Sequence, residues 1–286
     1  MPQFEVPEVD YSRYSNRQLL AVPLAVLLVA LLIVGGMWAL TGSPANLGVD
    51  FTGGSELTVD TSLSASDLAA QFDEPVVSVQ GIEGEGHYVV TFETANVDAV
   101  RSAADAHESI TVLGSGQTSP VFGEENKKWA IIGLAIAFAG MSVLAFALFR
   151  TFVPSLAIVV SAFSDMLVPI AVFNLLGLKL SLGTVAALLM LIGYSVDSDI
   201  LLTNHVLRRS GGFYESTYRA MQTGVTMTVT SISAMAVMAV AATFFGIELM
   251  ASIGLILVIG LTTDLVNTYM FNVSLLRWYK YEGVAR

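Results

Sequence analysis

Four aspartates lie in segments of this chain that are otherwise strongly apolar. Asp197 and Asp199 belong to LLMLIGYSVDSDILLTNHVL, residues 188–207, and Asp165 and Asp264 lie in two further apolar segments. None of these segments contains a lysine or arginine. Low dielectric disfavours a charged carboxylate, so a carboxyl group that takes up and releases a proton is the inexpensive solution there. The four residues are therefore candidate ion-coupling groups, as in a proton relay.

The elements that must position these aspartates are membrane-spanning helices. The chain has 286 residues, of which 54% are hydrophobic and 13% charged, and its mean hydropathy is +0.69. Such a composition indicates a membrane protein. Six apolar runs are long enough to cross a hydrocarbon core of about 30 Å, which takes about 20 helical residues. We place them at Leu19–Leu40, Trp129–Phe149, Phe152–Leu176, Leu180–Leu202, Val225–Phe245 and Leu249–Leu276.

The charged residues that bracket the spans place the four aspartates at similar depths. Asp165 falls at the centre of the third span and Asp264 close to the centre of the sixth. Asp197 and Asp199 lie about 5 and 8 Å from the centre of the fourth span, at about 1.5 Å per helical residue. A charged aspartate at mid-membrane costs about 2.5–3.5 kcal/mol on insertion scales. With no Lys, Arg or His at that depth, they must be protonated, bind a cation, face water or meet a base of another subunit.

The spacing of Asp197 and Asp199 separates their side chains by about 200° around a helix. We therefore expect one to face the bundle interior and the other a partner subunit, the lipid interface or water. Hydrogen bonding to neighbours for packing alone is the alternative for Asp165 and Asp264. Side chains able to satisfy them are Ser161, Ser164, Asn174, Thr262, Thr263, Asn267 and Thr268. Small or polar residues expected to support close helix packing are Gly193, Tyr194, Ser195, Ser198 and Thr230.

One long polar insertion, Thr41 to Lys128, separates the first two spans. Its strand and helix patterns follow the order βαββαβ, which is the ferredoxin-like arrangement. We predict its first strand at Glu56–Val59, its last at Ser109–Leu113, and a helix from Ser64 to Phe72 that starts with a Ser64/Asp67 capping box. The predicted fold is thus a six-helix membrane protein with a small α+β domain outside the membrane. No catalytic, metal or phosphate-binding motif appears, so we expect neither an enzyme nor a cofactor.

Basic residues predict the orientation of the chain. With the N-terminus inside, nine basic residues are cytoplasmic and four are not, which satisfies the positive-inside bias. We expect residues 1–18 and 277–286 in the cytoplasm, 19–40 as the first transmembrane helix, 41–128 outside the cell and 129–276 as a five-helix bundle. Most of the net charge of −11 comes from the insertion. Such a surface repels nucleic acid and suits concentrated salt, where the Debye length shrinks to about 3 Å at 1 M.

Two motifs resemble those of the SecF family. GVDFTGG at residues 48–54 follows the first span, as the family's G-[IV]-D-F-x-G-G signature does. IGYS at residues 192–195, with Arg208 and Arg209 after it, resembles the family's fourth-span signature. The resemblance extends over nearly the whole chain. It marks these further candidate residues in the outer domain: Asp50, Phe51, Gly53 and Gly54.

The resemblance implies a multi-pass protein of the cell membrane that pairs with SecD. It also implies contact with the translocating preprotein and with a SecY/SecE-like channel, ion coupling through membrane carboxyl groups, kinship with the resistance–nodulation–division (RND) transporters, and no metal. Here Ser198 occupies the position of the acid in the bacterial signature, and Asp197 and Asp199 flank it. Ser164 stands where the family shows a histidine before Asp165. These departures and the acidic composition favour an archaeal, halophilic branch.

Other functions remain as alternatives at this stage. The chain could be a structural scaffold for SecD without its own ion coupling. Half of an RND-type exporter of small molecules or lipids would use the same aspartates but would need a larger outer insertion. An intramembrane aspartyl protease would require Y-D and G-x-G-D contexts, which Asp165 and Asp197 lack. Sodium could replace the proton, because carboxylates flanked by hydroxyls suit either ion.

Overall fold

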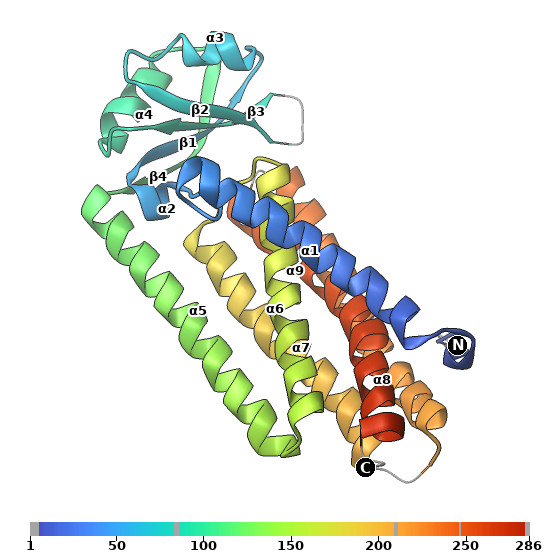
Figure 1. The fold of residues 1–286 in the computed structure, drawn as a ribbon. Coiled ribbons are helices and arrows are strands. Elements are labelled where there is room, and N and C mark those ends of the chain that lie inside the picture. The colour runs from blue at the N-terminus through green and yellow to red at the C-terminus, as the bar shows by residue number, and fades with distance from the viewer. Residues whose placement is uncertain (1–5, 83–85, 209–210, 246, 284–286) are drawn as a thin grey trace.

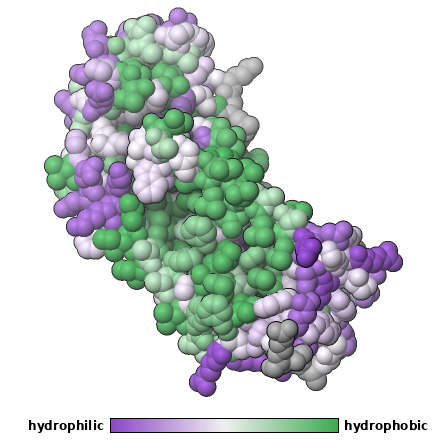
Figure 2. All heavy atoms as spheres, viewed as in Figure 1, coloured by the Kyte–Doolittle hydropathy of each residue, from purple (hydrophilic) through white to green (hydrophobic). Residues whose placement is uncertain are grey.

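The computed structural model describes residues 6–82, 86–208, 211–245 and 247–283. Arg209 of the predicted basic stretch lies outside these ranges. Within them, six helices are long and apolar enough to cross a membrane. A small sheet domain sits at one end of the helical bundle, and the start of the first helix lies at the other end (Figure 1). On the face seen in Figure 2, an apolar band covers the helices between two more polar ends.

The first five spans are continuous helices. They are α1 (Asn16–Thr41), α5 (Pro120–Phe149), α6 (Phe152–Leu175), α7 (Leu182–Arg208) and α8 (Phe213–Phe244). α5 begins well before the predicted Trp129, because Ser119 caps it and Pro120 occupies its first turn. In the apolar stretches of α6 and α7, 61% and 56% of the residues are buried, against 11% in those of α5 and α8. α6 and α7 therefore form the centre of the bundle.

The sixth span is interrupted where we predicted one uninterrupted helix. It consists of α9 (Glu248–Val266), a π-helical segment (Asn267–Asn272) and α10 (Val273–Trp278), followed by a second π-helical turn (Tyr279–Gly283). A π-helix pairs residues five apart instead of four, so it changes which side chains face inward. Tyr11, in a 3₁₀ turn before α1, donates a hydrogen bond of 2.9 Å to the carbonyl of Tyr269 in the π-helical segment. The N-terminal segment thus braces the irregular part of the sixth span.

The outer domain has the predicted βαββαβ order. Its elements are β1 (Gly54–Thr61), α3 (Ala65–Ala69), β2 (Val76–Gly81), β3 (His87–Phe92), α4 (Val97–Asp105) and β4 (Ile110–Thr118). The strand order is β2-β3-β1-β4 and all pairs are antiparallel. This is the ferredoxin-like topology that the pattern predicted. A separate helical turn, α2 (Val49–Thr52), precedes β1.

Four local predictions in this domain need correction. β1 and β4 extend beyond the predicted strands, and α3 ends before Phe72, which instead packs edge-on against Phe92. Ser64 does cap α3 by accepting a hydrogen bond of 3.3 Å from the Asp67 amide. However, the Asp67 carboxylate accepts from the Ser64 hydroxyl at 2.6 Å and not from its amide. The reciprocal arm of the predicted capping box therefore does not form.

Candidate functional site

Three of the four membrane aspartates meet in the interior of the bundle. Asp165 of α6, Asp199 of α7 and Asp264 of α9 each have 0% of their surface exposed. Asp197 is exposed on the outer side of α7, away from them. The predicted opposition of Asp197 and Asp199 is thus present, with Asp199 as the inner residue. We call Asp165, Asp199 and Asp264 the carboxyl cluster.

Asp165 is held by donors from two other helices. One of its carboxylate oxygens accepts a hydrogen bond of 2.6 Å from the Ser195 hydroxyl of α7. The other accepts one of 2.6 Å from the Asn267 side-chain amide, at the start of the π-helical segment. Both oxygens therefore have a neutral donor, and together they join the third, fourth and sixth spans.

Thr268 bridges the other two members of the cluster. Its hydroxyl lies 2.7 Å from an oxygen of Asp199 and 3.3 Å from an oxygen of Asp264. A threonine hydroxyl has one hydrogen to donate and lone pairs that accept. It can therefore donate to only one carboxylate, and the second contact becomes a hydrogen bond when the other carboxyl group carries a proton. At the shorter distance, Asp199 is the better-placed acceptor of the Thr268 hydrogen.

The cluster has too few donors for three charged carboxylates. Asn272 also donates to Asp199, but the second oxygens of Asp199 and Asp264 are buried without a hydrogen-bond partner. No ion pair in the described part of the chain involves any of the three. An unpaired buried charge is far more costly than a neutral acid, so the arrangement favours bound protons. The described residues contain no group of three or more His, Cys, Asp or Glu side chains arranged to hold a metal ion.

The π-helical segment supplies most of these donors. Asn267, Thr268 and Asn272 all belong to it, and all three are buried. In an α-helix, Asn267 and Asn272 would be separated by about 500° of rotation at 100° per residue, so they would point to different sides. The wider π-turn brings residues five apart closer to one face. The sequence predicts Asn267 and Thr268 as partners of Asp264. In the structure Thr268 contacts Asp264 and Asp199, whereas Asn267 donates to Asp165. Asn272 was not predicted, because no sequence motif indicates the π-helical turn.

A second candidate region joins the outer domain to α7. The carboxylate of Asp50, in α2, accepts a hydrogen bond of 2.9 Å from the amide of Leu182, the first residue of α7. An acidic group is favourable at a helix N-terminus, where amides are unpaired and the dipole is positive. The Asp50 carbonyl also accepts from the Asn126 side chain of α5 at 2.9 Å. Asp50 therefore links the base of the outer domain to two membrane helices.

Close backbone contacts surround this joint. A Cβ atom on Gly53 would lie 2.6 Å from the Pro120 Cα, and one on Gly54 would lie 2.5 Å from the Phe92 carbonyl oxygen. Both glycines have positive φ, 77° and 115°. A Cβ on Gly123 of α5 would lie 2.8 Å from the Gly53 nitrogen. Gly53 and Gly54 therefore form a tightly packed connection between the outer domain and α5.

Comparisons with known proteins agree with this architecture. Residues 99–282 match the family model described as "Protein export membrane protein SecD/SecF, C-terminal", and residues 38–62 match "SecD/SecF GG Motif". Relatives named "Protein-export membrane protein SecF" align over 100% of both chains, with 61% identity in Haloferax volcanii and 56% in Haloquadratum walsbyi. The chain belongs to the SecF family. The haloarchaeal relatives agree with the predicted archaeal, halophilic origin.

A solved structure supports the fold of this SecF-family chain. It is the crystal structure of SecDF, described as a translocon-associated membrane protein, from Thermus thermophilus. The TM-score is 0.73 at 22% identity, and the match covers 96% of our chain but 39% of the longer SecDF chain. At this identity the likeness concerns the fold alone. It shares the membrane bundle and the small outer sheet domain described above.

Other residues singled out in this SecF-family sequence lie outside the carboxyl cluster. Gly193 and Thr230 are exposed, and Thr230 donates to a carbonyl of its own helix. Thr262 and Thr263 also donate to their own helix, and Asn174 bonds the segment after α1. Hydroxyls that are buried without a hydrogen-bond partner belong to Ser161, Ser164, Tyr194 and Ser198. Among the residues expected to support helix packing (Gly193, Tyr194, Ser195, Ser198 and Thr230), only Ser195 forms a hydrogen bond with an aspartate.

The loop between α6 and α7 contacts the outer sheet. The Lys179 ammonium donates to the hydroxyls of Ser78 at 2.9 Å and Thr91 at 2.6 Å, and lies 3.9 Å from the Glu56 carboxylate. Burial lowers the pKa of Lys179, and Glu56 opposes this shift. Burial likewise raises the pKa of Glu56, against the effect of Lys179. This side of the SecF-family sheet is therefore in direct contact with the membrane bundle.

Proposed function

We propose that this protein works in the export of proteins, paired with SecD, and that ion binding at the carboxyl cluster moves the outer domain. The observation that carries the proposal is the cluster itself, with three buried acids, too few donors and no basic partner in the described chain. Intramembrane carboxyl groups in such a setting mark ion pathways. The cluster has no evident structural need for three acids, since uncharged residues would pack there at lower cost.

Proton movement would rearrange the hydrogen bonds around Thr268. When Asp264 is protonated, it donates to Thr268, which in turn donates to a charged Asp199. When Asp199 takes up the proton, it no longer needs donors from Thr268 and Asn272. The contacts that hold α7 against the π-helical segment then weaken. Protonation would thus shift these two helices relative to each other.

The other end of α7 offers a path for that shift to the outer domain. Asp50 binds the first amide of α7, and the loop before α7 pairs with the segment before α2 through Gly48 and Leu180 at 2.8 Å. Lys179 in the same loop contacts the sheet. A movement of α7 along its axis would therefore pull on the sheet domain. In this proposal the outer domain transmits the movement to a translocating preprotein.

The proposed placement has both termini in the cytoplasm and residues 41–128 outside the cell. The uneven distribution of basic residues supports this orientation. The proposed partners are SecD, a SecY/SecE-like channel and the preprotein. Asp197 supports a protein partner, because an exposed carboxylate on the outer side of a membrane helix is costly against lipid. A scaffold role without ion coupling is the second candidate, and the same exposed Asp197 favours it.

Export assays on single substitutions distinguish the two candidates. Cells lacking the gene would be complemented with Asp165→Asn, Asp199→Asn, Asp264→Asn and Asp197→Asn, and the secreted fraction of a reporter protein measured. Ion coupling predicts strong loss of export for the three cluster variants with normal recovery of SecD by coprecipitation. Normal export by all three would leave the scaffold role. Recovery of an efflux partner in place of SecD would contradict the export proposal.

A further inference from the structure

A cavity of about 400 Å³ lies at the end of the bundle opposite the sheet domain. Seven residues from the ends of four helical segments line it: Phe149, Thr151, Val206, Leu207, Arg208, Tyr279 and Lys280. Two of the seven are basic and none is acidic. In a chain with a net charge of −11, this is a local reversal of charge. The cavity is separate from the carboxyl cluster, with which it shares no residue.

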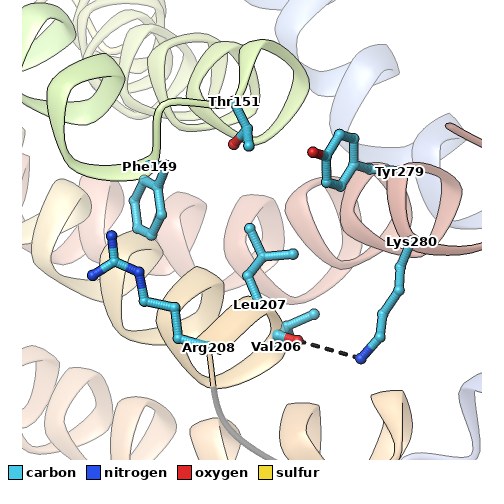
Figure 3. A pocket seen from close by; sticks show the side chains of 7 residues that line it. All are labelled: Phe149, Thr151, Val206, Leu207, Arg208, Tyr279 and Lys280. Atoms are coloured by element: carbon cyan, nitrogen blue, oxygen red, sulfur yellow. Dashed lines mark hydrogen bonds between the residues drawn. The ribbon is translucent and has the colours of Figure 1, made fainter. Parts of the chain in front are cut away.

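Both cations keep donors available for a ligand. Arg208 donates to the Leu148 carbonyl at 2.5 Å. Lys280 donates to the Val206 carbonyl at 3.3 Å, as Figure 3 shows. A guanidinium has five N–H donors and an ammonium has three, so most of them remain unused. Neither residue forms an ion pair within the described chain. The backbone bonds hold the two side chains at the cavity without neutralising their charge.

Thr151 adds a further unused donor. It precedes the first residue of α6, and its side chain does not cap that helix. Its hydroxyl oxygen is buried and has no hydrogen-bond partner. In Figure 3 the hydroxyl of Tyr279 points toward Thr151. The start of a long helix, two cations without an acidic partner and an unpaired hydroxyl together suit an anion with several acceptor oxygens, such as a phosphate group.

The surroundings favour a phosphate that belongs to a lipid. The cavity lies where four helical segments of the bundle end. Phe149 and Leu207 give it apolar walls, and Phe152 at the start of α6 is 69% exposed. Basic cavities between membrane helices bind anionic headgroups in this way. We propose that this cavity binds the phosphate of an anionic phospholipid in the leaflet opposite the sheet domain.

Native mass spectrometry of the full chain in an uncharged detergent tests this site. The probes are phosphatidylglycerol, zwitterionic phosphatidylcholine and inorganic phosphate. We expect one tightly retained phosphatidylglycerol, and binding about tenfold weaker or worse for the double variant Arg208→Gln/Lys280→Gln. The matched control is Arg13→Gln/Arg219→Gln, which removes the same charge from the same end of the protein but leaves the cavity intact. This control should bind like the unaltered protein.

A charge-preserving variant tests whether misfolding causes the loss of lipid binding in the double glutamine variant. Arg208→Lys/Lys280→Arg keeps both positive charges, which attract an anionic headgroup, and should retain binding within about threefold. Equal loss in the cavity and control variants, or equal retention of phosphatidylglycerol and phosphatidylcholine, would overturn the proposal. Displacement of the lipid by inorganic phosphate at equal concentration would assign the site to free phosphate and overturn the lipid part. Asp199→Asn should leave lipid binding unchanged. The lipid site is therefore tested separately from ion coupling.

Discussion

Asp197 and Asp199 stand two residues apart in α7 and have opposite surroundings. Asp199 is fully buried and accepts hydrogen bonds from Thr268 and Asn272, whereas Asp197 is exposed on the other side of the helix. The helical period predicts that they diverge. It does not predict which one is inside, because that depends on the packing of α6 and α9 against α7. The sequence therefore identified the acids, and only the packing distinguishes them.

Replacing Thr268 by valine tests the bridge between Asp199 and Asp264. Valine keeps the shape but removes the hydroxyl that contacts both carboxyl groups. We expect export to fall about tenfold or more, since a positioned proton-transfer group contributes about 10² to 10⁴ in rate. Thr268→Ser, which keeps the hydroxyl, should export at close to the normal rate. Equal export by the valine and serine variants would contradict the bridging role.

At the scale of elements, the sequence did not reveal the π-helical segment or the close packing of Gly53 and Gly54, which we call the glycine joint. Hydropathy marks the sixth span as continuous, because a π-turn needs no change in apolar character. The Gly53–Gly54 pair looks like an ordinary turn in sequence, since the atoms that require glycine come from Pro120 and Phe92, far along the chain. By contrast, the βαββαβ order was predictable from local alternation and turn residues.

The brace on the π-helical segment can be weakened without disturbing the membrane core. Tyr11→Phe removes the hydroxyl that donates to the Tyr269 carbonyl. This should lower the free energy of unfolding by about 1 kcal/mol, the usual net value of one hydrogen bond. Unfolding in mild detergent with increasing denaturant would measure it. Tyr14→Phe is the control, because Tyr14 is 48% exposed. A cost for Tyr14→Phe as large as that for Tyr11→Phe would argue against the brace.

The glycine joint makes a second prediction about stability. Gly54→Ala places a Cβ 2.5 Å from the Phe92 carbonyl oxygen at a φ of 115°, so strand β1 must shift. We expect a loss of about 1–3 kcal/mol, typical of strained backbone positions. Gly116→Ala in the neighbouring β4 has no atom within 4 Å of the added Cβ and should cost much less. Thermal unfolding of both variants checks the difference, and similar midpoints would show that the joint tolerates movement.

At the scale of the whole molecule, the membrane class, the six spans and the outer domain follow from composition and hydropathy. These features are predictable because the bilayer sets helix length and the outer domain has its own local patterns. What links them is not predictable in the same way. Asp50 on α2 binds α7 across 132 residues of sequence. That contact gives the proposed coupling its route, from the carboxyl cluster through α7 to the sheet.

The route through Asp50 predicts a separation of ion movement from export. Asp50→Asn weakens the charged cap on α7 but leaves the carboxyl cluster intact, so ion flux should persist while export falls. A charged cap contributes about 0.3–1 kcal/mol at an exposed helix end and up to about 2 kcal/mol when partly buried. Parallel measurements of reporter secretion and ion flux would show the difference. If both activities fall together, Asp50 acts on the cluster or on folding and the proposed route is wrong.

Ion flux through Asp199 tests the central claim most directly. The protein would be purified with SecD, reconstituted into vesicles and exposed to an inward proton gradient or an inward sodium gradient, with flux followed by dyes sensitive to each ion. We predict flux of one of the two ions for the unaltered protein and for Asp197→Asn, and background flux for Asp199→Asn. Flux in Asp199→Asn equal to that of the unaltered protein would contradict the account.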